Sequence, residues 1–121
     1  MQRLVTRTRD FALAARLEPA FDSRARRRGL LGRQALSPDT ALAIAPSNAI
    51  HTFGMQFPID VLFISRHGTV IKRVLALEPR RISAALGAFA VLEFAAGHPG
   101  VAATEKGDQL AVETENPAAH G

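Results

Sequence analysis

Residues 47–64 read SNAIHTFGMQFPIDVLFI, and the second half of this stretch decides the fold. Residues 58–65 are rich in valine, isoleucine and phenylalanine, the composition of a buried β-strand. Residues 66–68 read RHG, a tight turn in which Gly68 can take a positive φ, and residues 69–77 return as the second arm of a hairpin. The stretch therefore predicts a β-sheet built around this hairpin.

The rest of the chain predicts one helix and several more short strands. The helix is expected within residues 20–33, with Asp22 or Ser23 as its N-cap and Gly32 as its stop. Further strands are expected at residues 41–45, 88–96 and 109–114. Less regular segments are residues 3–8 (edge strand or frayed tail), 11–17 (strand or helix), 82–87 (irregular), 98–105 (a helical turn) and 115–121 (disordered).

These elements predict an α+β fold in a single compact domain spanning residues 1–121. The core is expected at about residues 11–114, with residues 1–9 and 115–121 frayed. We expect a strongly curved, barrel-like, mainly antiparallel sheet with one short helix packed on it. The strands near Asp60 and Glu93 are apolar on both faces, so the centre of the sheet should be covered on both sides.

Composition and charge narrow the classes of function. The chain has no cysteine, which excludes disulfides, thiolate metal sites and a cysteine nucleophile. Residues 1–34 hold nine arginines, yet no nucleic-acid motif or array of stacking aromatics accompanies them, so nucleic acid is not the expected partner. No signal peptide or transmembrane segment is recognisable. We expect a cytoplasmic protein, with an exported or envelope location as the alternative if a leader has been trimmed.

Two boxes carry a resemblance to a known family. The IHTFGM motif followed by FPIDVLFI at residues 57–64, together with RARRRGLLGR at residues 24–33, resembles the DUF192 family (COG1430). The resemblance covers residues 17–113 and includes the Gly107-Asp108 turn. It implies a compact single-domain prokaryotic protein, and it brings no agreed activity and no cofactor. Relatives often carry a cysteine at what we take to be the position of Ser47, so a nucleophile there would be weaker in this chain.

Two carboxylates, Asp60 and Glu93, stand inside apolar strands. A buried carboxylate needs a partner, because its desolvation is otherwise costly. For Asp60 we expect backbone N–H donors from residues 52–54, or an ion pair with Arg28 or Arg33; the alternative is a general acid or base. For Glu93 we expect a bidentate pair with an arginine of residues 24–33. A glycosidase-like pair of the two carboxylates is a further alternative.

His51 lies in the kind of loop that often presents functional side chains, and it is a candidate general base or hydrogen-bond donor to a ligand. The candidate catalytic residues are His51, Asp60 and Ser47. The candidate ligand-binding residues are Thr52, Phe53, Gly54, Met55, Arg28 and Glu93. The four histidines show no paired ligand spacing, so no metal site and no cofactor are predicted.

Two functions follow from these residues. The first is a non-catalytic binding module with a pocket for a small molecule or peptide near residues 47–60. The alternative is a small hydrolase or transferase that uses His51 with Asp60 or Ser47. The binding module is the preferred prediction, because the sequence lacks a complete catalytic constellation. The ligand and the oligomeric state stay open.

Overall fold

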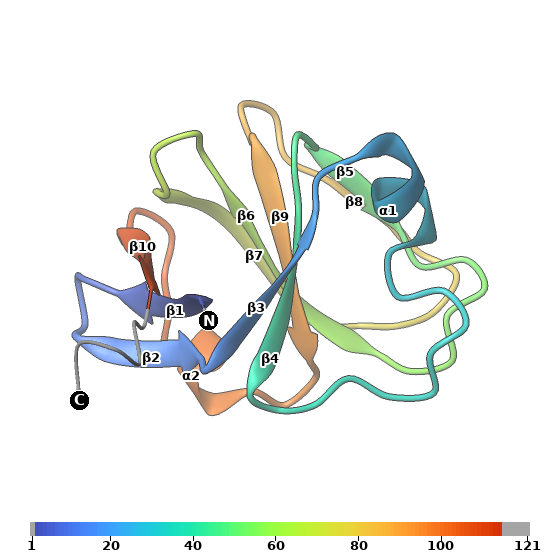
Figure 1. The fold of residues 1–121 in the computed structure, drawn as a ribbon, viewed down its shortest axis with the longest axis horizontal. Coiled ribbons are helices and arrows are strands. Elements are labelled where there is room, and N and C mark those ends of the chain that lie inside the picture. Colours follow the sequence, from blue (N-terminus) through green and yellow to red (C-terminus); the bar gives the residue numbers. More distant parts are fainter. Residues whose placement is uncertain (1, 115–121) are drawn as a thin grey trace.

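A computed structural model describes residues 2–114. Within this range the chain forms ten strands and two short helices, mostly β, in one compact unit (Figure 1). The strands are β1 (Gln2–Thr6), β2 (Phe11–Ala14), β3 (Arg16–Ala20), β4 (Thr40–Ile44), β5 (Ala49–His51), β6 (Ile59–Ile64), β7 (Val70–Leu77), β8 (Ile82–Ala84), β9 (Ala90–Ala95) and β10 (Leu110–Thr114). The helices are α1 (Ser23–Arg28) and α2 (Pro99–Ala102).

The strands form three sheets. The largest has the order β3-β4-β9-β6-β7, and all of its pairs are antiparallel except β3 with β4. A three-stranded sheet, β10-β1-β2, lies on one side of it, and the two-stranded sheet β5-β8 lies near α1 on the other (Figure 1). The predicted barrel is not supported, because none of these sheets closes or curls strongly.

The central strands β4, β6 and β9 are buried along nearly their whole length. One core cluster lies on the face toward the three-stranded sheet and includes Leu4, Leu62 and Phe94. The other lies on the face toward α1 and includes Val61 and Val91. Successive strand residues point to opposite faces, so each central strand contributes to both clusters. The prediction that the sheet is covered on both sides is confirmed.

Helix α1 is shorter than predicted. Asp22 is its N-cap and accepts a hydrogen bond of 2.8 Å from the Ala25 N–H. Gly29, at φ 47°, ends the helix before the predicted stop at Gly32. No residue of α1 is fully buried, and the helix packs on the sheet only through Ala25, which is partly buried against the core cluster. Leu30, just after the helix, is buried in the same cluster and holds the segment in place.

Two segments pair where the sequence did not predict it. Residues 82–84, expected to be irregular, form β8 and pair with β5 through Ala49↔Ala84 and His51↔Ile82. Gln2–Thr6 forms β1, which is the central strand of its sheet rather than an edge. The pairings of β5 with β8 and of β1 with β10 join segments far apart in the chain, and local sequence patterns do not encode such partners. The predicted disorder of residues 115–121 lies outside the described residues.

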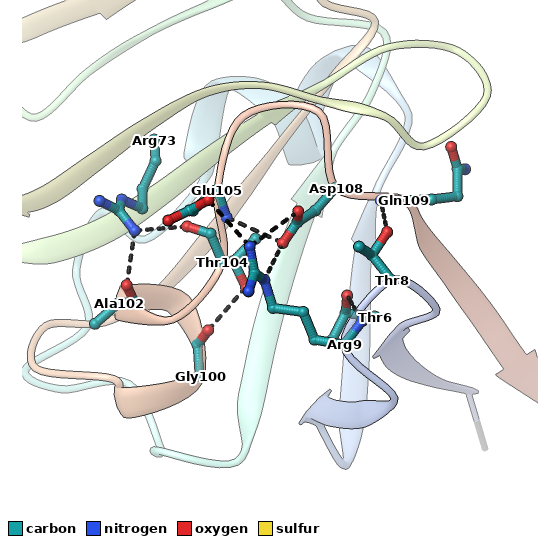
Figure 2. Close-up of polar contacts among 10 residues, drawn as sticks. All are labelled: Thr6, Thr8, Arg9, Arg73, Gly100, Ala102, Thr104, Glu105, Asp108 and Gln109. Atoms are coloured by element: carbon teal, nitrogen blue, oxygen red, sulfur yellow. Dashed lines mark hydrogen bonds and ion pairs between the residues drawn. The ribbon is translucent and has the colours of Figure 1, made fainter.

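A cluster of polar side chains links the β1–β2 loop to the loop before β10 (Figure 2). Arg9 Nε donates to Asp108 Oδ2 at 2.6 Å, and the guanidinium also lies 3.2 Å from Glu105 Oε2. The Gln109 N–H donates to Thr8 Oγ1 at 2.8 Å. The Arg9 guanidinium lowers the pKa of the Asp108 carboxyl. The polar groups of this cluster are hydrogen-bonded or ion-paired to one another. We therefore interpret the cluster as a structural link between the two loops rather than as a functional site.

Candidate functional site

A cleft of about 760 Å³ opens between α1 and the sheet, bordered by the β4–β5 connection. Its volume falls in the range of roughly 300–1,000 Å³ typical of small-molecule sites. The apolar part of its wall includes Leu30, Leu31, Ile44, Ile50 and Met55. The polar part includes Arg26, Arg27, Arg28, Ser47, His51 and Glu93. The cleft therefore combines an apolar surface with cationic groups and one carboxylate.

Glu93 stands on β9 between β4 and β6, opposite Leu42 and Val61. It is 4% exposed, and its Oε2 has no hydrogen-bond partner within residues 2–114. Burial raises the pKa of the Glu93 carboxyl to about 7, although the positive charge of Arg33 opposes the rise. The expected bidentate pair is not formed, because Arg33 donates to Glu18 Oε2 at 2.8 Å instead. Glu93 is thus an unpartnered acceptor in the lining of the cleft.

The arginines come from the last turn of α1, where Gly29 ends the helix. Arg26 donates to the Phe21 carbonyl at 2.6 Å, and Arg27 Nε donates to the Ser23 carbonyl at 3.3 Å. Arg28 is exposed, and its guanidinium makes no hydrogen bond or ion pair with residues 2–114. All three line the cleft, and none of them forms an ion pair within residues 2–114. The positive side of the cleft is consequently free to receive an acidic group.

Ser47 and His51 both line the cleft, but they do not form a nucleophile–base pair. The Ser47 hydroxyl donates to the Ala49 carbonyl at 2.9 Å. His51 is exposed on β5, and its ring lies 5.8 Å from the ring of Phe53. Within the described chain, His51 has no hydrogen bond to Ser47 or Asp60. An activated serine would need such a bond to a base.

Asp60 lies away from the cleft, on the other face of the sheet. Its two oxygens accept backbone N–H bonds from Ala76 at 2.8 Å and from His98 at 2.9 Å, and the residue is 2% exposed. The expectation of backbone donors is met, but the predicted donors at residues 52–54 and the predicted arginines are wrong. Asp60 is opposite Phe94 while Val61 is opposite Glu93, so the two carboxylates point to opposite faces. This excludes the glycosidase-like pair.

The four remaining candidates, residues 52–55, take different positions. Met55 lines the cleft. Thr52 is fully buried beneath the surface, and Phe53 is about half exposed. Gly54 has φ +84°, and a Cβ there would approach Leu31 Cδ2 to 3.2 Å, so glycine keeps this wall of the cleft in place. Of the nine predicted residues, five line the cleft: Ser47, His51, Met55, Arg28 and Glu93.

Thr52 has a structural role that can be tested. Its Oγ1 donates to the Glu78 carbonyl at 2.7 Å and accepts from the Arg81 N–H at 2.8 Å. Thr52→Val keeps the shape but removes both bonds, so we expect a loss of about 1–2 kcal/mol in the free energy of unfolding. Urea denaturation measures this loss. Thr114→Val, at an exposed position on β10, is the matched control, and an equal effect at both positions would contradict the assignment.

Sequence reasoning missed the contribution of Ile44, Ile50 and Leu31 to the apolar wall. The signal was present in the arginine–glycine–leucine box of residues 24–33, which supplies both cations and leucines to the cleft. Within residues 2–114, no three histidine or acidic side chains gather as a metal site would require. In the same range, no helix has the length and apolar character needed to cross a membrane.

Comparisons with known proteins identify a matching family and solved structures with a similar fold. The sequence model of the family described as "DUF192: Uncharacterized ACR, COG1430" matches residues 4–112, which confirms the resemblance seen in the sequence. A crystal structure of a protein of unknown function from Novosphingobium aromaticivorans DSM 12444 is similar, with a TM-score of 0.70 and 22% identity over 78% of this chain and 73% of that chain. At that identity the likeness shows the fold alone.

A second crystal structure, from Sinorhizobium meliloti 1021, is designated a candidate transcription regulator. It has a TM-score of 0.77 and 26% identity, over 92% of this chain and 91% of that chain. No protein of curated function matches the chain. The comparisons therefore supply a shared fold and no assigned activity.

Proposed function

The chain belongs to the DUF192 family, and we propose that it is a non-catalytic binding module. Its cleft beside α1 receives a small ligand that carries an amine at one end and an acidic group at the other. Short peptides with free termini are the class that fits best. Catalysis is not part of the proposal, because Ser47 lacks a base and Asp60 points away from the cleft.

The observation that carries the proposal is the Glu93 carboxylate. A buried acceptor without a partner is costly, and few such groups persist without a reason. A ligand amine would supply the missing donor and, when charged, the missing counter-charge. Glu93 lines the cleft, and its unpartnered Oε2 is buried at the cleft wall.

The rest of the cleft supports the other features of the ligand. The arginines at the end of α1 favour a carboxylate, and Arg28 has no partner among residues 2–114 that would compete for it. The apolar wall favours side chains between the two charged ends, each buried CH₂ contributing about 0.8 kcal/mol. A free amine, an apolar body and a free carboxylate together describe a short peptide.

The test is enrichment of dipeptides from a defined pool by the immobilised full chain, followed by calorimetry on those retained. We expect N-acetylation to weaken binding by about 10- to 100-fold, the effect of losing one charge-assisted hydrogen bond. Glu93→Gln should have the same effect, while Glu78→Gln, the same change on an exposed residue, should have none. Equal retention of free and acetylated pools, or no retention of either, would refute the proposal.

The acidic end is tested by Arg28→Gln, with Arg24→Gln as the matched control on the same helix but outside the cleft. We expect only the first to weaken binding, and only for dipeptides with a free C-terminus. If both arginines instead mattered equally, for DNA and with a steep dependence on salt, α1 would be a polyanion-binding surface. That result would favour the designation given to the Sinorhizobium relative.

The affinity should also depend on pH in a defined direction. Below pH 7 the Glu93 carboxyl is mostly protonated, since its pKa is about 7, and a neutral group attracts the amine weakly. Above roughly pH 8 a peptide amine loses its own proton. We therefore expect affinity to rise from pH 5.5, peak between pH 7 and 8, and then fall. Calorimetry across this range measures it, and a rising limb that survives in Glu93→Gln would contradict the assignment.

A further inference from the structure

A second hollow, separate from the cleft, lies between the three-stranded sheet and the five-stranded sheet. It has a volume of about 430 Å³ and is lined mainly by apolar side chains. Leu4 and Leu110 come from the three-stranded sheet, and Ala43 and Leu92 from the five-stranded sheet. We call this hollow the inter-sheet groove. None of the residues predicted as a site lines it.

The mouth of the inter-sheet groove leaves large apolar side chains in contact with water. Phe21 is 55% exposed and Val112 is 47% exposed, and both border it. Covering exposed apolar surface is favourable by roughly 25 cal/mol per Å². An apolar ligand entering the groove would gain from the hollow and from these two side chains at its edge.

Two arginines, Arg7 and Arg66, also line the inter-sheet groove. Arg66 lies over the Phe89 ring, with its guanidinium carbon 4.6 Å from the ring centroid, and both residues line the groove. The Arg7 N–H donates to the Gln109 carbonyl at 2.8 Å, and Gln109 Nε2 in turn donates to the His67 carbonyl. These bonds hold the backbone at Arg7 next to the 66–68 turn. Within residues 2–114 neither guanidinium forms an ion pair.

We propose that the inter-sheet groove binds a free fatty acid. The acyl chain occupies the apolar hollow, and the carboxylate lies at Arg7 and Arg66. The apolar lining excludes a ligand that is charged along its length, and the unpaired guanidinium groups favour an acid over an alcohol or a quaternary amine. The proposal is independent of the dipeptide cleft, because the two cavities share no lining residue.

The experiment is titration of the full chain with octanoate, decanoate and dodecanoate below their micelle concentrations, followed by NMR and calorimetry. We expect resonance shifts at Gly68, Ala90 and Ala111 and none at Gly29 or His51. Affinity should rise about fourfold for each added CH₂ until the groove is filled, which is the effect of burying one methylene. Dodecanol should bind about tenfold more weakly than dodecanoate, and dodecyltrimethylammonium should not bind.

Variants complete the test. Arg7→Gln/Arg66→Gln should weaken dodecanoate binding about tenfold, whereas Arg24→Gln/Arg81→Gln, the same charge change outside the groove, should not. Val112→Asp places a carboxylate at the mouth on an exposed position and should also weaken it. Glu93→Gln should leave it unchanged. The proposal is overturned if dodecanoate causes no shifts in the groove, if both double variants bind it equally, or if only anionic phospholipid vesicles are bound.

Discussion

Glu93→Gln should stabilise the protein by about 3 kcal/mol at pH 8 and leave its stability nearly unchanged at pH 4.5. The Glu93 pKa rises from an ordinary value of 4.5 to about 7 on folding, because burial disfavours the charged carboxylate. Between these values the folded protein holds a proton that the unfolded chain has released. Stability therefore falls as the pH rises from 4.5 to 7, at roughly 1.4 kcal/mol per pH unit. Glutamine does not titrate, so it removes this loss.

Urea denaturation at pH 4.5, 6 and 8 measures the effect. The matched control is Glu78→Gln, which makes the same change on an exposed side chain and should shift stability by no more than about 0.5 kcal/mol. A stability difference that is the same at every pH would show that Glu93 is not the titrating group. A variant that is more stable yet fails to bind the dipeptide would mark Glu93 as a residue kept for binding, at the expense of stability.

Asp60→Ala should lower the free energy of unfolding by about 3 kcal/mol. The Asp60 carboxylate accepts one backbone N–H from Ala76 on β7 and one from His98, the N-cap of α2. Hydrogen bonds to charged groups contribute roughly 1.5–3 kcal/mol each, and the substitution removes two. Ala76 has φ 52°, an uncommon conformation for alanine, so this carboxylate also holds an unusual point of β7 in place.

Thermal denaturation should show a fall in Tm on the order of 10 °C for Asp60→Ala. Glu78→Ala, which removes an exposed carboxylate, is the control and should change Tm little. At a temperature where the variant is folded, its affinity for the dipeptide should match that of the native protein, because Asp60 does not line the cleft. A native Tm combined with lost binding would reverse this assignment and return Asp60 to the site.

Asp60 and Glu93 show what could and what could not be predicted from the sequence. Each stands in an apolar strand, and that alone predicts that each needs a partner. The partners depend on strand register, which places Val61 opposite Glu93 and Asp60 opposite Phe94. One carboxylate meets two backbone N–H groups on its face of the sheet, and the other meets none on the opposite face. Nothing in the local sequence distinguishes them.

Helix α1 is a second example. The Asp22 cap, the run of arginines and the following leucines all predict a helix here, and one is present. The chain offers two glycines as the stop, Gly29 and Gly32, and both have positive φ. Leu30 is buried against the sheet directly after Gly29, so the helix ends at Arg28 and leaves its arginines along the cleft. The burial of Leu30 therefore determines that Gly29, and not Gly32, ends the helix.

The sequence by itself determined the family, the β-rich single unit, the 59–77 hairpin and the coverage of the sheet on both faces. Each rests on neighbouring residues: side-chain alternation, turn chemistry or a motif. The tertiary structure alone decided that the sheets stay open, that β5 pairs with β8, and that Ser47 and His51 share a cleft with Glu93 but not with Asp60. These depend on the register and pairing of distant strands, which arise only when the whole chain packs together.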